Sequence, residues 1–232
     1  MQVRDLGRMA YGRAFDVQRD VHGGVLAARE RGDGCVGTIL LVEHDPAVIT
    51  VSRRQGARAH LVAGDDALAR AGVEVCETDR GGDITYHGPG QLVVYPIVDL
   101  NRLGGGGLGL HGYMRALEGA VMRASAAFGV ETHREKGMTG VWVAPDEARS
   151  LELRKIAALG VRVRRWVTMH GLALNVTTRL EHFGMIVPCG LAGVGVTSLE
   201  RELGAACPAM PEVKRVLVDA LAAELGAVVG DE

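Results

Sequence analysis

Stretches rich in β-forming residues occur in neighbouring groups along this chain, and that arrangement limits the folds open to it. The stretches lie at residues 37–42, 47–51, 73–77, 91–98, 140–143, 156–163 and 167–176. A doubly wound parallel sheet needs strands and helices to alternate, whereas strands in neighbouring groups favour α+β. We therefore expect an α+β (α/β mixed-sheet) fold in a single domain over residues 1–232, with its core at about 5–225.

Helical spacing of apolar residues marks the helices of this domain. The spacing predicts a long helix over 11–31 and another over 113–128, and Pro211 suits the first turn of a last helix that continues to Leu225. A short helix is expected to begin with Asp65 or Asp66 as its cap and to end at Gly72. Because proline has no backbone N–H, Pro96 in the run 91–98 is expected at a sheet edge or at a bulge.

Charge and hydropathy exclude several classes of protein. The 232 residues carry a net charge of −2, which argues against nucleic-acid binding by overall positive charge. The chain has no run of about 18 apolar residues that would predict a membrane span. Charged residues already occur at Arg4 and Asp5, which is too close to the N-terminus for the apolar segment of a signal peptide. We expect a cytoplasmic protein that forms no contacts with membranes.

Lysine and cysteine are both scarce, so few residues are available for a reaction that needs an amine or a thiol. Of 26 basic residues, only Lys136, Lys155 and Lys214 are lysines, so a reaction that needs an amine has three candidates. The four cysteines form no CxxC pair, so no metal site is expected. Without a signal peptide they do not suggest a disulfide framework either, and we expect free thiols.

Two glycine-rich segments are candidate ligand loops. The first contains Gly107, Gly109 and Gly112 in the spacing GxGxxG, but no strand runs directly into it, so a flexible connector is favoured over a dinucleotide site. The second, RGGDITYHGPGQ at 80–91, combines glycines with polar side chains between two predicted strands. It is consistent with a long hairpin connection or with a site in which backbone amides approach a ligand.

Lys155 and Cys189 are candidates for covalent chemistry. Lys155 is the first residue of an apolar predicted strand. A lysine buried there would destabilise the fold, so it is expected to reach solvent or to have a function. Cys189 lies between Pro188 and Gly190 on a predicted turn, which suits a nucleophile, although most cysteines in such chains are small buried residues. An adjacent cation would lower the pKa of this thiol from about 8.5.

Alternation along 160–164 predicts an outward basic face on one strand. Val161 and Val163 are expected to point inward and Arg162 and Arg164 outward. Such a face is either a solvated strand edge or a binding surface for an acidic partner protein.

Taken together, these motifs resemble the lipoyl(octanoyl) transferases of lipoate biosynthesis. The matching blocks are RGGDITYHGPGQ at 80–91, GVWV at 140–143, KIAALGVRVRRWVTMHGLALNV at 155–176 and PCG at 188–190, with weaker matches at 11–18 and 43–50. The resemblance covers about residues 5–225 and implies the biotinyl/lipoyl protein ligase catalytic fold.

The resemblance also implies a two-step acyl transfer. An octanoyl group leaves the phosphopantetheine thiol of acyl carrier protein and forms a thioester with Cys189. A lysine of a lipoyl domain in a 2-oxoacid dehydrogenase, or of the glycine-cleavage H protein, then attacks that thioester. Lys155 is implied as the partner of Cys189, no cofactor or metal is implied, and the enzyme is expected to be a monomer.

Further residues are implied to bind the substrate or to support the site. The substrate-binding set comprises Arg80, Gly81, Gly82, Asp83, Ile84, Thr85, Tyr86, His87, Ala158, Leu159, Gly160, Gly171, Leu172 and Ala173. His170 and Asn175 are candidate supporting residues, and Leu174 is a further candidate for contact with the acyl chain. Position 158 is alanine where many relatives carry serine, so no hydroxyl contact is expected there.

Two alternatives remain open at this point. An ATP-dependent lipoate or biotin ligase would have the same fold but would activate a free acid as an adenylate and need no cysteine nucleophile. A non-catalytic acyl-binding protein would have the fold alone. The presence of both Lys155 and Cys189 favours the transferase.

Overall fold

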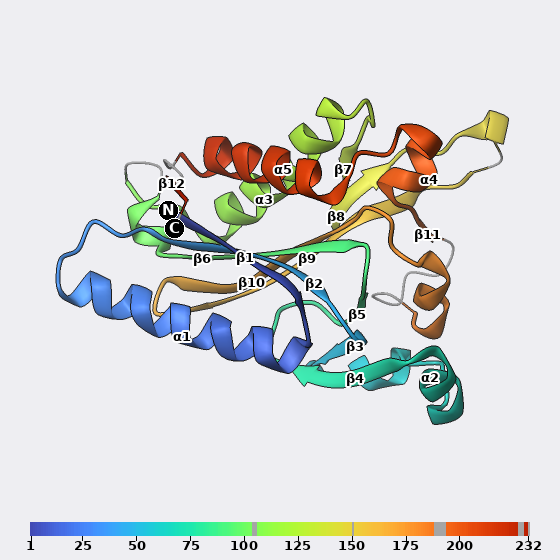
Figure 1. Cartoon of the computed structure of the whole chain (residues 1–232), viewed down its shortest axis with the longest axis horizontal. Helices are drawn as coiled ribbons and strands as arrows, with labels where there is room; N and C mark the ends of the chain where they lie inside the picture. The colour runs from blue at the N-terminus through green and yellow to red at the C-terminus, as the bar shows by residue number, and fades with distance from the viewer. Residues whose placement is uncertain (104–105, 150, 188–193, 227–229, 232) are drawn as a thin grey trace.

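A computed structural model describes residues 1–103, 106–149, 151–187, 194–226 and 230–231 of the chain. Its elements form a large sheet that has helices on both faces and a small sheet at one end (Figure 1). Within these residues, no helix is long and apolar enough to cross a membrane.

The large sheet contains nine strands in the part of the chain that the structure describes. Its order is β12-β1-β2-β6-β10-β9-β8-β7, and β11 pairs with β9 off this path. The strands are β1 (Gln2–Met9), β2 (Gly37–His44), β6 (Gln91–Val98), β7 (His133–Glu135), β8 (Met138–Val143), β9 (Arg154–Arg164), β10 (Val167–Asn175), β11 (Gly195–Val196) and β12 (Gly230–Asp231). The β1 pairings and the β11–β9 pairing are parallel and the others antiparallel, so the prediction of a mixed sheet is confirmed.

The small sheet has the order β4-β3-β5 and lies beside the short helix α2 (Asp65–Ala71). Its strands are β3 (Ala47–Ser52), β4 (Val73–Thr78) and β5 (Ile84–His87). The chain then passes directly from β5 into β6 of the large sheet through residues 88–90. This short connection holds the small sheet against the end of the large one.

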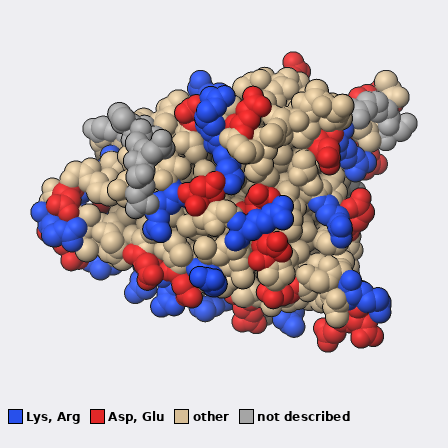
Figure 2. Space-filling view, in the orientation of Figure 1, with Lys and Arg blue, Asp and Glu red and all other residues tan. Residues whose placement is uncertain are grey.

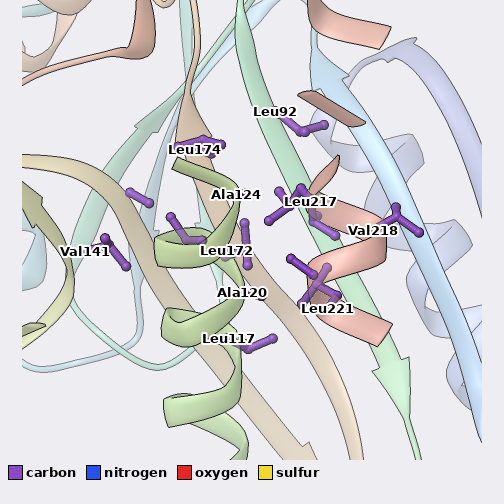
Figure 3. Packing of buried hydrophobic residues seen from close by; sticks show 14 of the residues in the cluster. Leu92, Leu117, Ala120, Ala124, Val141, Leu172, Leu174, Leu217, Val218 and Leu221 are labelled. Carbon is purple, nitrogen blue, oxygen red and sulfur yellow. The ribbon is translucent and has the colours of Figure 1, made fainter. Parts of the chain in front are cut away.

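Helices cover both faces of the large sheet. On one face, α3 (Leu110–Ala127) and α5 (Met210–Leu225) pack side by side, and on the other lies α1 (Tyr11–Glu30) (Figure 1). Leu117, Leu217 and Leu221 are fully buried between α3, α5 and the sheet (Figure 3). The short helix α4 (Leu199–Leu203) follows β11. Burial of these apolar faces accounts for the layered architecture.

The predicted strands and helices are present, with ends that differ by a few residues. The helix predicted at 11–31 ends at Glu30, and its two adjacent glycines do not interrupt it. Gly72 ends α2 in a left-handed conformation, but Gly64 is the N-cap residue, and Asp65 and Asp66 lie in the first turn. Strand β1 was not predicted, because its charged and half-exposed residues show no clear alternation. Strand β5 was not predicted either, because it lies inside the segment 80–91 that was expected as a loop. That segment is no hairpin connection, since β4 and β5 lie on opposite sides of β3.

Pro96 does not lie at an edge of the sheet, so this part of the prediction is wrong. Strand β6 is an interior strand between β2 and β10. Its ladder with β10 extends from the Gln91–Asn175 pair to the Val94–Leu172 pair and stops before Pro96. Beyond that point, the Thr168 hydroxyl donates to the Pro96 carbonyl and accepts from the N–H of Val98. A side chain thus replaces the ladder bonds where proline has no N–H to donate.

A buried cluster of histidine and tyrosine side chains joins α1 to both sheets. His44 Nε2 lies 2.7 Å from the Tyr95 hydroxyl, and Nδ1 lies 3.1 Å from the Met9 carbonyl oxygen. The Tyr11 ring contacts the His44 ring edge-on at 5.3 Å between centroids. Burial lowers the pKa of His44 to about 4, outweighing its hydrogen bond to Met9, so the folded protein holds this imidazole neutral.

The core between α3 and α5 generates a first prediction. Leu221→Ala removes a fully buried side chain and leaves a cavity, so we expect the free energy of unfolding to fall by about 2–5 kcal/mol. Urea unfolding measures this change. Val62→Ala, at a position 57% exposed, is the control and should change stability by less than about 0.5 kcal/mol. Equal losses for both variants would contradict this packing.

His44 generates a prediction on acid stability. Below a pH of about 6.5 the unfolded chain takes up a proton at His44 that the folded protein does not, so stability is lost as the pH falls toward 4. At about 1.36 kcal/mol per pH unit, the loss from this one group approaches about 3 kcal/mol at pH 4. We expect His44→Gln to flatten the decline of unfolding free energy between pH 6.5 and 4.5. His111→Gln, at the exposed start of α3, is the control, and identical slopes for wild type and His44→Gln would rule out this role.

Candidate active site

A cavity of about 510 Å³ lies where the small sheet, β9, β10 and the start of α3 meet. The structure brings fifteen of the residues singled out from the sequence to its lining. These are Arg80, Gly81, Gly82, Asp83, Ile84, Thr85, His87, Lys155, Ala158, Leu159, Gly160, His170, Gly171, Leu172 and Ala173. Residues far apart in the sequence thus form one site.

Lys155 reaches this cavity from the beginning of β9. Its ammonium nitrogen lies 4.5 Å from the ring centroid of Trp142 on β8, within the range of a cation–π interaction. The β8–β9 pairing shifts register between Val141 and Trp142, next to the Trp142–Lys155 pair.

Two glycines allow the segment 80–82 to lie directly on β9. The N–H of Gly81 donates to the Val161 carbonyl oxygen at 2.9 Å. A Cβ on Gly81 would lie 2.8 Å from that oxygen, and a Cβ on Gly160 would lie 2.7 Å from the Gly81 carbonyl oxygen. Any larger residue at either position would therefore push the two backbones apart.

Arg80 is fixed beside this contact by backbone and side-chain acceptors. Its guanidinium donates to the Thr50 carbonyl oxygen at 2.8 Å and to the Thr50 hydroxyl, and to the Gly81 carbonyl oxygen at 3.1 Å. These bonds restrict the rotation of the Arg80 side chain and hold its positive charge at the cavity wall.

A chain of buried hydrogen bonds runs from His87 to the backbone of Lys155. His87 Nδ1 lies 2.7 Å from Oε1 of Gln91, whose amide donates to Asn175 at 2.9 Å. Asn175 donates to the Thr197 carbonyl oxygen, and the Thr197 N–H donates to the Lys155 carbonyl oxygen, each at 2.9 Å. Burial lowers the pKa of His87 well below its usual range, so a neutral imidazole donates from Nδ1.

His170 lies at the cavity in an uncommon backbone conformation for a strand residue. Its φ is 59°, and its N–H donates to the side chain of Gln18 at 2.8 Å. Its Nε2 lies 2.9 Å from Asp79, and burial lowers the pKa of His170 more than this bond raises it. Burial tends to raise the pKa of Asp79, but its bond to His170 and the charge of Arg162 outweigh that effect and lower it.

The side chains of Asp83 and His60 lie close together, and Asp83 lines the cavity. Oδ2 of Asp83 lies 2.6 Å from Nδ1 of His60, and the Asp83 side chain is only 4% exposed. Neither Nδ1 of His60 nor the other carboxylate oxygen of Asp83, Oδ1, has a partner in hydrogen-bond geometry among the residues that the structure describes.

Cys189 itself lies outside the described residues, but both flanks of its segment are fixed beside the cavity. On one side, the Val187 N–H donates to the His60 carbonyl oxygen at 2.8 Å, and Leu61 bridges to Ile186. On the other, β11 pairs in parallel with Arg154 and Lys155 of β9. The segment that contains Cys189 therefore begins at the small-sheet side and ends beside Lys155.

Three residues singled out from the sequence do not line this cavity. Tyr86 points into the core of the small sheet, where its hydroxyl lies 3.0 Å from Nδ1 of His182. Asn175 is buried in the hydrogen-bond chain from His87. Leu174 is fully buried in the core beneath α3 and α5.

The sequence reasoning missed several residues of the lining. The missed side chains are mostly aromatic and apolar, namely Tyr11, Arg54, Val93, Tyr95, Leu110, Met114, Met138, Thr139, Val161, Phe183 and Val196. Tyr11 opens the block 11–18 that carries part of the resemblance, and this was a usable signal. The methionines carried no signal, because single apolar residues on helices and strands are expected in any core.

The predicted basic face on β9 is only partly present. Arg164 is exposed, but Arg162 pairs with Asp79 and its side chain is 35% exposed. Arg164 is also nine residues from Lys155, about 30 Å along the strand at about 3.3 Å per residue. Over the face drawn in Figure 2, basic and acidic side chains are interspersed.

The GxGxxG segment does not have the setting of a dinucleotide site. Strand β6 ends at Val98, and a 3-10 turn at Leu100–Arg102 separates it from Gly107. Gly109 is the N-cap of α3. Within the described ranges, no cluster of three or more His, Cys, Asp or Glu side chains is arranged to hold a metal ion.

The sequence is similar to a family model described as the lipoyl protein ligase A/B catalytic domain, which matches residues 25–222. An octanoyltransferase from Acidobacterium capsulatum is 46% identical over 208 residues, covering 88% of this chain and 80% of that protein. One from Bacteroides fragilis is 44% identical and covers 93% of both chains.

Solved structures with much lower sequence identity have the same fold. A bipartite lipoate protein ligase from Thermoplasma acidophilum has a TM-score of 0.70 at 14% identity, covering all of this chain and 85% of that one. A biotin protein ligase from Aquifex aeolicus has a TM-score of 0.54 at 12% identity, covering 97% and 70%. From the matched family model and these relatives, the chain belongs to the lipoyl protein ligase A/B catalytic domain family.

Proposed function

We propose that this protein is an acyltransferase that moves an octanoyl group from acyl carrier protein to a lysine ε-amino group on lipoyl domains. Octanoyltransferases at 42–46% identity over most of the chain support the acyl group and the reaction type. The solved Thermoplasma ligase was studied together with its E2 lipoyl domain, which supports lipoyl domains as acceptors. The H protein of glycine cleavage is the other proposed acceptor.

The observation that carries this proposal is the placement of Lys155 in a cavity with apolar walls. Leu159, Leu172 and Ala173 line the cavity beside the glycine contacts of segment 80–82. Burial of an alkyl chain there contributes about 0.8 kcal/mol per CH₂. A lining that combines apolar side chains with a few polar groups suits a fatty acyl thioester better than a compact polar ligand.

In the first step, the Cys189 thiolate attacks the acyl carbonyl carbon of the donor thioester. A carbon–sulfur bond forms to Cys189, the bond to the phosphopantetheine sulfur breaks, and the leaving thiolate takes a proton from Lys155. One thioester replaces another, so the exchange is nearly balanced in energy and requires no ATP or other cofactor. The ammonium form of Lys155 would lower the pKa of a neighbouring thiol.

In the second step, the acceptor amine attacks the Cys189 thioester and forms an amide. The carbon–sulfur bond breaks, and the nitrogen loses a proton to Lys155, which gave one up in the first step. The Cys189 thiolate is then again paired with an ammonium group. We propose that the enzyme acts in the cytoplasm, as a monomer, with the donor delivered by acyl carrier protein. The competing function is ATP-dependent ligation on the same fold, and adenylate formed from ATP and octanoate without acyl carrier protein would establish it.

Cys189 generates a prediction on covalent acylation. After incubation with octanoyl-acyl carrier protein, intact-mass measurement should find one octanoyl adduct on the wild-type protein. Cys189→Ser should not retain a thioester adduct that hydroxylamine removes, because an ester is formed and cleaved far less readily than a thioester. Variants of Cys35, Cys76 and Cys207 serve as controls and should keep the adduct. An adduct that persists in Cys189→Ser at the wild-type level would refute the intermediate.

Lys155 generates a prediction on thiol reactivity. In a protein whose other three cysteines are replaced by alanine, Lys155→Ala should slow alkylation of Cys189 near neutral pH, because the thiolate loses its cation. The rate is measured with iodoacetamide over a range of pH. Lys136→Ala, on the turn between β7 and β8, is the control. If the alkylation profile of Lys155→Ala matches wild type, the lysine does not activate the thiol.

A further inference from the structure

The lining of the cavity contains one exposed arginine that the mechanism does not use. Among the described residues of the lining there are two arginines and one lysine, Arg54, Arg80 and Lys155, against one carboxylate, that of Asp83. The guanidinium of Arg80 is already bonded to acceptors of the protein. The side chain of Arg54 is exposed, and no residue that the structure describes forms a hydrogen bond or an ion pair with it. Because it is both exposed and part of the lining, Arg54 lies at the opening of the cavity.

Arg54 belongs to a basic loop, which we define as residues 52–60. Over residues 46–64 the chain contains three arginines, Arg53, Arg54 and Arg58, and no aspartate or glutamate. All three are exposed, and within the described part of the chain their side chains form no hydrogen bond or ion pair. Uncompensated positive charge at an opening attracts anions from solution. The planar guanidinium group is well suited to phosphate in particular.

Hydrogen bonds fix the basic loop at the cavity. The Ser52 hydroxyl donates to the Gly82 carbonyl oxygen at 2.9 Å and accepts from the backbone N–H of Arg54 at 3.2 Å. At the other end of the loop, the His60 carbonyl oxygen accepts from the N–H of Val187 at 2.8 Å. The loop therefore extends from the glycine-rich segment to the start of the segment that contains the nucleophile.

We propose that Arg54, assisted by Arg53 and Arg58, binds the phosphodiester of the donor's phosphopantetheine arm, an inference that rests on the proposed function. Of the two substrates, only the acyl donor has a phosphate joined to the reacting thioester by a short chain. The reacting group of the acceptor is an amine, which carries no negative charge. A guanidinium group forms paired hydrogen bonds with phosphate oxygens, and Arg54 can form them without breaking a bond to another described residue.

The length of the phosphopantetheine arm fits the separation between the basic loop and Lys155. The glycine-rich segment to which the loop is bonded contacts β9 at Gly160, five residues from Lys155. Five residues span about 16 Å along a strand at about 3.3 Å per residue. About thirteen bonds join the phosphorus to the thioester sulfur, and at about 1.2 Å per bond, as in an extended polypeptide, they reach about 15 Å. The arginine side chain extends this reach, so a phosphate bound at the loop allows the thioester to reach Lys155.

The test compares two small donors that differ only in the phosphate. S-octanoyl pantetheine lacks it, whereas S-octanoyl phosphopantetheine methyl ester has a phosphodiester like that of acyl carrier protein. Intact-mass measurement follows the rate of acyl-enzyme formation from each donor. We expect the wild-type protein to react about tenfold faster with the phosphodiester at low donor concentration, as one charge-assisted hydrogen bond would give. Arg54→Gln should lower this ratio to about 1, and damage to the fold would slow both donors without changing the ratio.

Two further variants and a binding measurement serve as controls. Arg70→Gln removes another exposed arginine near the small sheet, in the last turn of α2, and should keep the wild-type ratio. Arg53→Gln combined with Arg58→Gln should lower the ratio by a smaller factor, and it gives the same comparison if Arg54→Gln does not fold. Calorimetric titration with the two compounds without their octanoyl group should find about tenfold tighter binding of the phosphodiester by wild type, and no such difference for Arg54→Gln.

Three outcomes would overturn the proposal. The first is an equal rate for both donors in the wild-type protein, and the second is a preference for the phosphodiester that survives Arg54→Gln. The third is an equal loss of this preference in Arg70→Gln, which would indicate an effect of overall charge. Failure of the wild-type protein to form an acyl-enzyme with either donor or with octanoyl-acyl carrier protein would instead refute the proposed function on which the inference rests.

Discussion

The backbone contact between segment 80–82 and β9 determines the shape of the site. Gly81 and Gly160 approach so closely that neither position has room for a Cβ. The contact ties the connection that leaves the small sheet to a central hairpin of the large sheet, and the cavity lies beside it. Arg80, Asp83 and His87 all lie within a few residues of this point, so their positions depend on it.

Buried polar groups then fix the backbone of Lys155 at the cavity. The hydrogen-bond chain from His87 through Gln91 and Asn175 ends on the backbone of Lys155. Each buried member has its partner, and a fully satisfied network in a low dielectric favours one arrangement over alternatives. Burial lowers the pKa of His44, His87 and His170, so these histidines can form buried hydrogen bonds without placing a charge in the core.

Much of this architecture could be predicted from the sequence, for identifiable reasons. Periodicity located the helices and most strands, and the glycine-rich block at 80–91 located one wall of the cavity. Strand β1 could not be found, because its charged residues are half-exposed and its partners are distant in sequence. Arg162 was expected in solvent because alternation shows which way a side chain points but not that Asp79 lies opposite it. The orientation of Tyr86 likewise depends on His182, which is 96 residues away.

Main-chain atoms form part of the cavity wall, and this affects how the site could change over time. A Cβ on Gly171 would lie 2.2 Å from the Val94 carbonyl oxygen, and a Cβ on Gly81 or on Gly160 would lie 2.8 or 2.7 Å from a backbone oxygen. Point substitution at these positions cannot widen the space, because there is no side chain to remove, and cannot narrow it without disrupting the sheet. Variation in the length of the acyl group that is accepted must therefore arise at positions that have side chains to exchange, such as Leu159, Met114 and Met138. The main-chain part of the wall is thus the part least open to gradual adaptation.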